Sequence, residues 1–138
     1  MEKRDLAVKP RILVADDTRD TADVYCFLLS AAGYRVARAY DGLTAAALAK
    51  VTKPDIAILN HQMPGLSGLG VLQELRAAGV GTKVIITSGI DDFAALAERA
   101  LAEGAEVCVR QPWPADRLLR MVSAVLEQPR SFRSKPKP

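Results

Sequence analysis

The sequence is poor in cysteine and histidine and contains no long apolar run. It has 138 residues, of which two are cysteines, Cys26 and Cys108, and one is a histidine, His61. That is too few for a disulfide framework or a zinc site built from four cysteines. No apolar run approaches the ~20 residues of a membrane-spanning helix, and the charged start of the chain leads into no signal-peptide core. We therefore expect a soluble protein of the reducing cytoplasm.

The remaining composition is typical of a globular protein. Hydrophobic residues make up 49% of the chain and charged residues 25%, which excludes a disordered or low-complexity polymer. The length suits one domain with a sizeable core. We predict a flexible segment over residues 1–10, a domain over residues 11–128, and a disordered basic tail over residues 129–138. The Pro, Ser, Lys and Arg content of that tail cannot bury apolar area.

The net charge of +3 is unevenly distributed. Residues 1–11 carry a balance of +2 and residues 129–138 a balance of +4, which leaves −3 for the body between them. A folded nucleic-acid-binding domain usually carries a basic patch on its body. The distribution therefore argues against nucleic acid as a partner, and the charged tail is more typical of a solubilising segment.

Short β-branched runs alternate with helical patterns, as in a parallel α/β sheet. Strands are expected at residues 11–15, 35–39, 55–59, 83–87 and 106–110. Helices are expected at about 19–32, 42–51 and 68–78, from a cap at Asp91 or Asp92 to Glu103, and at 115–127. These five units fill the chain and leave no room for a second domain.

Polar residues follow the predicted strands. Ligands of an open parallel sheet bind outside the carboxyl ends of its strands, so the residues at these ends are the first functional candidates. They are Asp16 and Asp17, Asn60, Thr87 and Ser88, and Gln111. Two adjacent carboxylates are hard oxygen ligands that suit Mg²⁺. Such pairs also cap helices, and the pair alone leaves both interpretations open.

Five stretches occur in an order that belongs to one family: ILVADD at 12–17, PDIAILN at 54–60, MPGLSG at 63–68, VIITSG at 84–89 and GAE at 104–106. The sequence thereby resembles the receiver domain of two-component response regulators, in the CheY-like superfamily. The resemblance implies a flavodoxin-like α/β fold with a five-stranded parallel sheet of order 2-1-3-4-5 and five helices. It also implies a signalling module and not an enzyme.

The resemblance assigns roles to several strand-end residues. Family receivers accept a phosphoryl group from a histidine kinase onto an aspartate that ends the third strand. An acid pair that holds Mg²⁺ lies beside it, with a hydroxyl residue after the fourth strand and a lysine before a proline after the fifth. Asp16 and Asp17 match the acid pair. Ser88 matches the hydroxyl residue better than Thr87 does, because Gly89 fits the small residue that follows.

Three positions depart from the family pattern. Asn60 stands at the phosphoacceptor position, Gln111 at the lysine position, and Cys108 at the aromatic position that is linked to switching. A carboxamide oxygen is a poor nucleophile and cannot form the acyl phosphate that a carboxylate forms. Glutamine gives no cationic contact to a transferring phosphoryl group. The sequence therefore predicts a pseudo-receiver that is not phosphorylated at the usual site.

The resemblance still implies a magnesium site, although a weak one. Three carboxylates and one lysine would give the family site a formal charge of about −2, and Asp16 and Asp17 alone give the same value. We expect these two side chains, together with backbone oxygens near Gln62, to bind Mg²⁺ weakly because the third carboxylate is missing.

Other residues invite a functional interpretation. Gln111-Pro112 stands where the family has a lysine–proline peptide bond that is usually cis. Trp113 is either an exposed contact on the partner surface of the fourth helix, fifth strand and fifth helix, or a packing anchor. Strand alternation should turn His61 away from Asn60, and we expect Cys108 to fill the core.

We conclude that the sequence encodes a module that binds a histidine kinase or another signalling protein, or forms a homodimer, away from membranes. One alternative keeps the phosphorelay active through Ser88, Thr87, His61 or a restored aspartate at position 60. A second alternative is a nucleic-acid accessory protein that acts through its basic tails.

Overall fold

The structure, a computed structural model, describes residues 9–89 and 91–129. The strands are β1 (Arg11–Ala15), β2 (Arg35–Ala39), β3 (Ile56–Asn60), β4 (Lys83–Ser88) and β5 (Val107–Arg110). The helices are α2 (Arg19–Ala31), α3 (Gly42–Thr52), α4 (Gly68–Ala77), α5 (Phe93–Ala102) and α6 (Ala115–Glu127). Every predicted element is present, with ends that differ by one or two residues. The predicted N-terminal segment and basic tail lie almost entirely outside the described residues.

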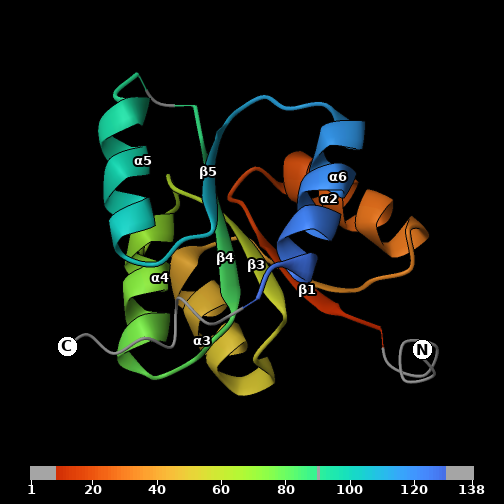
Figure 1. Cartoon of the computed structure of the whole chain (residues 1–138), viewed down its shortest axis with the longest axis horizontal. Coiled ribbons are helices and arrows are strands. Elements are labelled where there is room, and N and C mark those ends of the chain that lie inside the picture. The colour runs from red at the N-terminus through yellow and green to blue at the C-terminus, as the bar shows by residue number, and fades with distance from the viewer. Residues whose placement is uncertain (1–8, 90, 130–138) are drawn as a thin grey trace.

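The five strands form one parallel sheet in the order β2-β1-β3-β4-β5. This is the predicted flavodoxin-like topology. Helices α3, α4 and α5 cover one face of the sheet, and α2 and α6 cover the other (Figure 1). Because α helices cover both faces, the central strand β3 is buried along its whole length and is apolar until Asn60. The edge strand β2 instead carries two arginines, Arg35 and Arg38, and is partly exposed.

The alternation of side chains along each strand divides the core in two. Leu13 and Ala15 face the cluster under α3, α4 and α5, whereas Ile12 and Val14 face the cluster under α2 and α6. Cys108 is half-buried and packs against the first cluster, and the thiols of Cys26 and Cys108 are unpaired. Among the described residues, no helix combines the length and apolar character that crossing a bilayer requires.

Trp113 is a packing anchor, and its alternative interpretation as an exposed partner contact is wrong. Its side chain is 5% exposed and belongs to the cluster under α2 and α6. The indole Nε1–H donates a hydrogen bond of 3.0 Å to the Tyr25 hydroxyl oxygen, and the two rings meet edge to face with centroids 6.4 Å apart. The burial of this large apolar side chain therefore fixes the loop between β5 and α6 onto α2. The predicted cis peptide bond joins Gln111 and Pro112 in this loop.

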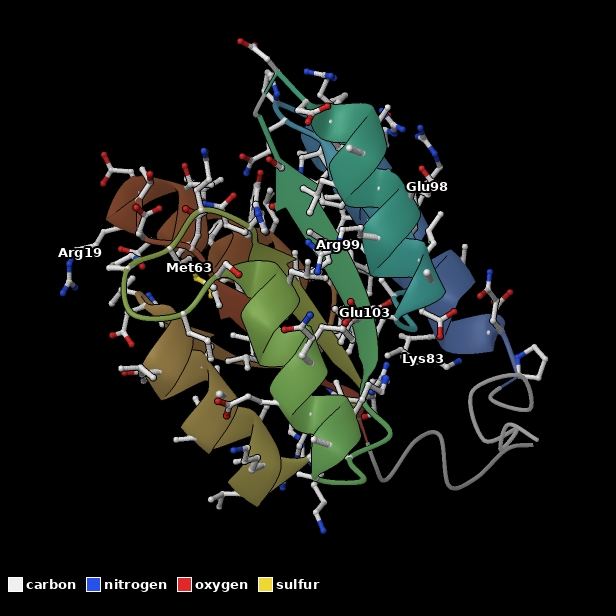
Figure 2. All side chains as sticks on the ribbon, turned by 90° about the vertical axis from the view of Figure 1, so that its left-hand side faces the viewer. Arg19, Met63, Lys83, Glu98, Arg99 and Glu103 are labelled. Atoms are coloured by element: carbon white, nitrogen blue, oxygen red, sulfur yellow. The ribbon has the colours of Figure 1, made fainter. Side chains whose placement is uncertain are left out.

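Lys83 is a buried cation at the start of β4, with 4% of its surface exposed. Its Nζ donates a hydrogen bond of 2.9 Å to the Val125 carbonyl and another to the Gln128 carbonyl. Figure 2 shows Lys83 beside the C-terminal end of α6. Carbonyls at this end of a helix lack partners within the helix, and a cation there is also favoured by the helix dipole.

We expect Lys83→Met to lower the free energy of unfolding by about 1–3 kcal/mol, because hydrogen bonds from a buried charged donor are lost. The matched control is Lys50→Met, since Lys50 makes an ion pair with Glu74 on the surface. That pair should contribute less than about 1 kcal/mol. Urea unfolding of both variants measures the difference, and equal losses would contradict a capping role for Lys83.

Candidate functional site

A cavity of about 530 Å³ opens at the carboxyl ends of the strands. We call it the acidic cavity. It is lined by Asp16, Asp17, Thr18, Thr21, Tyr25, Asn60, Gln62, Gly89, Gln111 and Pro112. The structure thus brings together most of the residues that the sequence singled out, and none of the described lining residues is a lysine or arginine. Sequence analysis missed Thr18, Thr21 and Tyr25, which line the cavity from the start of α2.

Asp16 is the most enclosed acid of the cavity, with 4% of its surface exposed. Its backbone amide donates to the Ala39 carbonyl of β2, and its Oδ1 accepts a hydrogen bond of 3.0 Å from the Thr18 amide. Burial raises the pKa of Asp16, the Thr18 hydrogen bond opposes that rise, and the negative charge of Asp17 adds to it. Ionisation of Asp16 therefore lowers the free energy of unfolding.

Asn60 ends β3 and is 8% exposed. Its Nδ2 donates a hydrogen bond of 2.9 Å to the Gln62 carbonyl and lies 3.4 Å from Asp17 Oδ1. Gly68 allows α4 to begin close against β3, because a Cβ there would lie 2.6 Å from the Asn60 carbonyl oxygen. The Gly68 amide also donates to the His61 carbonyl, 2.9 Å away. The loop after β3 is thereby folded back so that the Gln62 carbonyl meets the Asn60 side chain.

Gln111 connects the acids to the aromatic pair on the other side of the cavity. Hydrogen bonding by its side chain lowers the pKa of Asp16. It also opposes the rise that burial causes in the pKa of Tyr25, as does the hydrogen bond from Trp113. Gln111 thus lines the same cavity as Asp16 and Tyr25, and the Tyr25 hydroxyl accepts a hydrogen bond from the buried indole of Trp113.

The two hydroxyl residues of β4 are buried but do not line the cavity. Thr87 is 1% exposed and Ser88 is fully buried. Thr87 is the register partner of Asn60, whereas Ser88 is the partner of Arg110 on β5. Gly89, the residue after them, reaches the cavity wall. The geometry places both hydroxyls next to the cavity without exposing either to it.

His61 lies outside the acidic cavity, on the opposite side of β3 from Asn60. Its backbone amide donates to the Thr87 carbonyl at 2.8 Å. Burial lowers the pKa of His61, and the positive charge of Arg99 on α5 lowers it further. Figure 2 shows Arg99 on the side of α5 that faces α4, with Glu98 on the opposite side. This arrangement agrees with the expectation that His61 points away from Asn60.

The predicted magnesium ligands lie in one cavity, but the Asn60 side chain already contacts two of them. Asp16, Asp17 and Gln62 line the same cavity, and their oxygens are the donor type that Mg²⁺ prefers. When bound, the ion would supply positive charge between these oxygens. However, the Asn60 nitrogen donates to the Gln62 carbonyl and approaches Asp17. Within the described residues, no group of three or more His, Cys, Asp or Glu side chains could hold a metal. The residues present therefore fit Mg²⁺ only in part.

We expect Asp16→Asn to raise the melting temperature at neutral pH. The pKa of Asp16 lies above its ordinary value in the folded chain, so ionisation costs stability at high pH, and the cost disappears as pH falls through the folded pKa. Asparagine retains the oxygen that accepts from Thr18. The advantage of the variant should therefore shrink in acid, as thermal unfolding against pH would show.

The matched control is Asp23→Asn, for which the expected change in melting temperature has the opposite sign. Hydrogen bonds from Tyr40 and Arg38 lower the pKa of Asp23, so its ionised form stabilises the fold above the unfolded pKa and that contribution is lost in acid. The control should lower the melting temperature at neutral pH. A shift of both variants in the same direction would contradict the assignment.

Comparison with known proteins identifies the family. The family described as "Response regulator receiver domain" matches residues 12–123. The response regulator MprA of Mycobacterium avium (strain 104) is 33% identical over 120 residues, which cover 86% of this chain and 51% of that protein. MprA of Mycobacterium ulcerans (strain Agy99) is 32% identical over 120 residues, covering 86% and 50%. The chain spans about half the length of these curated relatives.

Solved structures of receiver domains are similar to this structure and support the same family. The Francisella response regulator 1452 receiver domain has a TM-score of 0.80 at 28% identity, covering 92% of this chain and 100% of that one. The receiver domain of NtrX from Brucella abortus has a TM-score of 0.78 at 30% identity, covering 86% and 99%. Receiver domains of response regulators are signalling modules. With its fold, its acidic cavity and these relatives, the chain belongs to the response regulator receiver domains of two-component systems.

Proposed function

We propose that this receiver domain signals by binding a protein partner and is not phosphorylated at position 60. The main support is the position and hydrogen bonding of the Asn60 side chain. Its side chain ends β3 inside the acidic cavity, and its nitrogen is hydrogen-bonded to the Gln62 carbonyl. A neutral amide in this place cannot attack phosphorus, displace the leaving group of the phosphate donor and form an acyl phosphate, as a carboxylate can.

The rest of the cavity supports the same proposal. Gln111 occupies the wall position next to Pro112, in the same lining as Asp16 and Tyr25. It supplies no positive charge to a transferring phosphoryl group, which requires cationic or preorganised donors. The positions of the nucleophile and the cation are thus both occupied by neutral amides.

Phosphorylation at another residue has less structural support. The hydroxyls of Thr87 and Ser88 are buried and lie outside the cavity lining. His61 is turned toward α5 and has its pKa lowered by burial and by Arg99. A phosphate donor that entered the cavity would therefore meet Asn60 before any of these three.

We expect the native chain to gain no phosphoryl group on incubation with acetyl phosphate and Mg²⁺, as intact mass spectrometry would show. The double variant Asn60→Asp, Gln111→Lys should gain one that hydroxylamine removes. Asn60→Asp alone should be labelled on the order of 100-fold more slowly, since a charge-stabilising donor is missing. Stoichiometric, hydroxylamine-labile labelling of the native chain would overturn the proposal. An acid-stable label would instead support a serine or threonine ester.

The surface of α5, β5 and α6 is our proposed partner site. β5 is an edge strand of the sheet, flanked by these two helices. Leu101 on α5 is 50% exposed. Arg110 at the end of β5 is exposed and stacks its guanidinium over the Phe93 ring, 4.8 Å from the ring centroid. Cys108, at the family's switching position, is half-buried, Pro112 is exposed, and Trp113 is buried.

We expect Arg110→Glu to weaken binding to a partner histidine kinase by on the order of tenfold, the effect typical of an arginine near the centre of an interface. The matched control is Lys50→Glu on α3, which packs against β1 and β2. Binding of both variants to a panel of purified kinases, together with sedimentation of the native chain to detect self-association, provides the test. Equal effects of the two substitutions would contradict this surface as the partner site. No binding by any kinase would contradict histidine kinases as the class of partner. Trp113→Ala is unsuitable here because it removes a core side chain.

A further inference from the structure

The Asn60 amide group occupies a position between two acceptors that both favour positive charge. Its Nδ2 lies 2.9 Å from the Gln62 carbonyl oxygen and 3.4 Å from Asp17 Oδ1. A primary amide nitrogen carries two N–H groups, so it can direct one toward each acceptor. Asn60 is 8% exposed, whereas Asp17 is exposed, and both line the acidic cavity.

We propose that the Asn60 amide nitrogen is a built-in substitute for a divalent cation, and that it competes with any such cation for Asp17 and the Gln62 carbonyl. The proposal concerns what the cavity binds and does not depend on which protein partner is recognised. It assigns Asn60 a positioning role, since the amide holds the loop after β3 against the acid pair.

The polarity of the amide supports this assignment. If the side chain were turned by 180°, its Oδ1 would face the carbonyl of Gln62 and the carboxylate of Asp17. Three acceptors would then meet without a donor, which is unfavourable at a buried position. That orientation becomes favourable when a cation lies between the oxygens. A divalent cation that uses the lone pairs now facing the Asn60 nitrogen must therefore displace or rotate the amide.

The competition predicts an unusual order of cation affinity. Asn60→Ala removes the competing nitrogen and leaves Asp16, Asp17 and the Gln62 carbonyl in place. It should bind a divalent cation about two- to tenfold more tightly than the native chain, the equivalent of one hydrogen bond. Asn60→Asp should bind more tightly still, because it adds a carboxylate. If Asn60 were instead an oxygen ligand, Asn60→Ala would weaken binding.

The test is a titration of the three chains with Mn²⁺, followed by the electron paramagnetic resonance signal of the free ion, with Mg²⁺ as competitor. The expected order of affinity is Asn60→Asp, then Asn60→Ala, then the native chain. Adding Asp17→Asn to each chain should weaken binding, which confirms the location. Native affinity equal to or above that of Asn60→Ala overturns the proposal, as does a failure of both variants to bind Mn²⁺.

A second measurement on the native chain guards against loss of structure in Asn60→Ala. The Asn60 side-chain amide protons should exchange slowly with water, because they are hydrogen-bonded at a buried site. Millimolar Mg²⁺ should accelerate their exchange in nuclear magnetic resonance spectra to the extent that it binds. Binding of Mg²⁺ between Asp17 and Gln62 with these protons still protected would overturn the proposal.

Discussion

The acidic cavity depends on the hydrogen bonding of one amide group at the end of β3. Asn60 donates to the Gln62 carbonyl and approaches Asp17, so it joins the loop after β3 to the acid pair after β1. This contact places a neutral donor beside the acid pair, and the cavity lining includes no lysine among the described residues. The same amide thus underlies both the internal order of the cavity and the proposed loss of phosphoacceptor chemistry.

The cavity adjoins the core under α2 and α6. Gln111 lines the cavity together with Asp16 and Tyr25, and the Tyr25 hydroxyl accepts a hydrogen bond from the indole of Trp113. Trp113 packs in the core under α2 and α6. A change at the acid pair that moved Gln111 would therefore alter the packing of the loop that begins α6, which borders the proposed partner surface. Cys108, at the family's aromatic position, contributes only packing on the other face.

Much of the fold could be predicted from the sequence, because strand and helix periodicities are local. The motif order then located Asp16, Asp17, Asn60 and Gln111 at one end of the sheet. Three features could not be found this way. Lys83 reads as an exposed charge, yet the turn into β4 buries it beneath α6. Trp113 stood in a loop whose facing partner, Tyr25, is 88 residues away. The third is Tyr25, for which the one available signal is its place in the second turn of the helix that follows the acid pair.

The most direct test of the account is an atomic-resolution crystal structure grown with millimolar Mg²⁺, at which the amide nitrogen and oxygen can be distinguished. The account predicts that the Asn60 nitrogen faces the Gln62 carbonyl and Asp17, with no metal ion between them. Any ion that does bind there should displace or rotate the amide, so a magnesium ion bound by Asp17 and the Gln62 carbonyl with the Asn60 nitrogen still facing both oxygens would contradict the account.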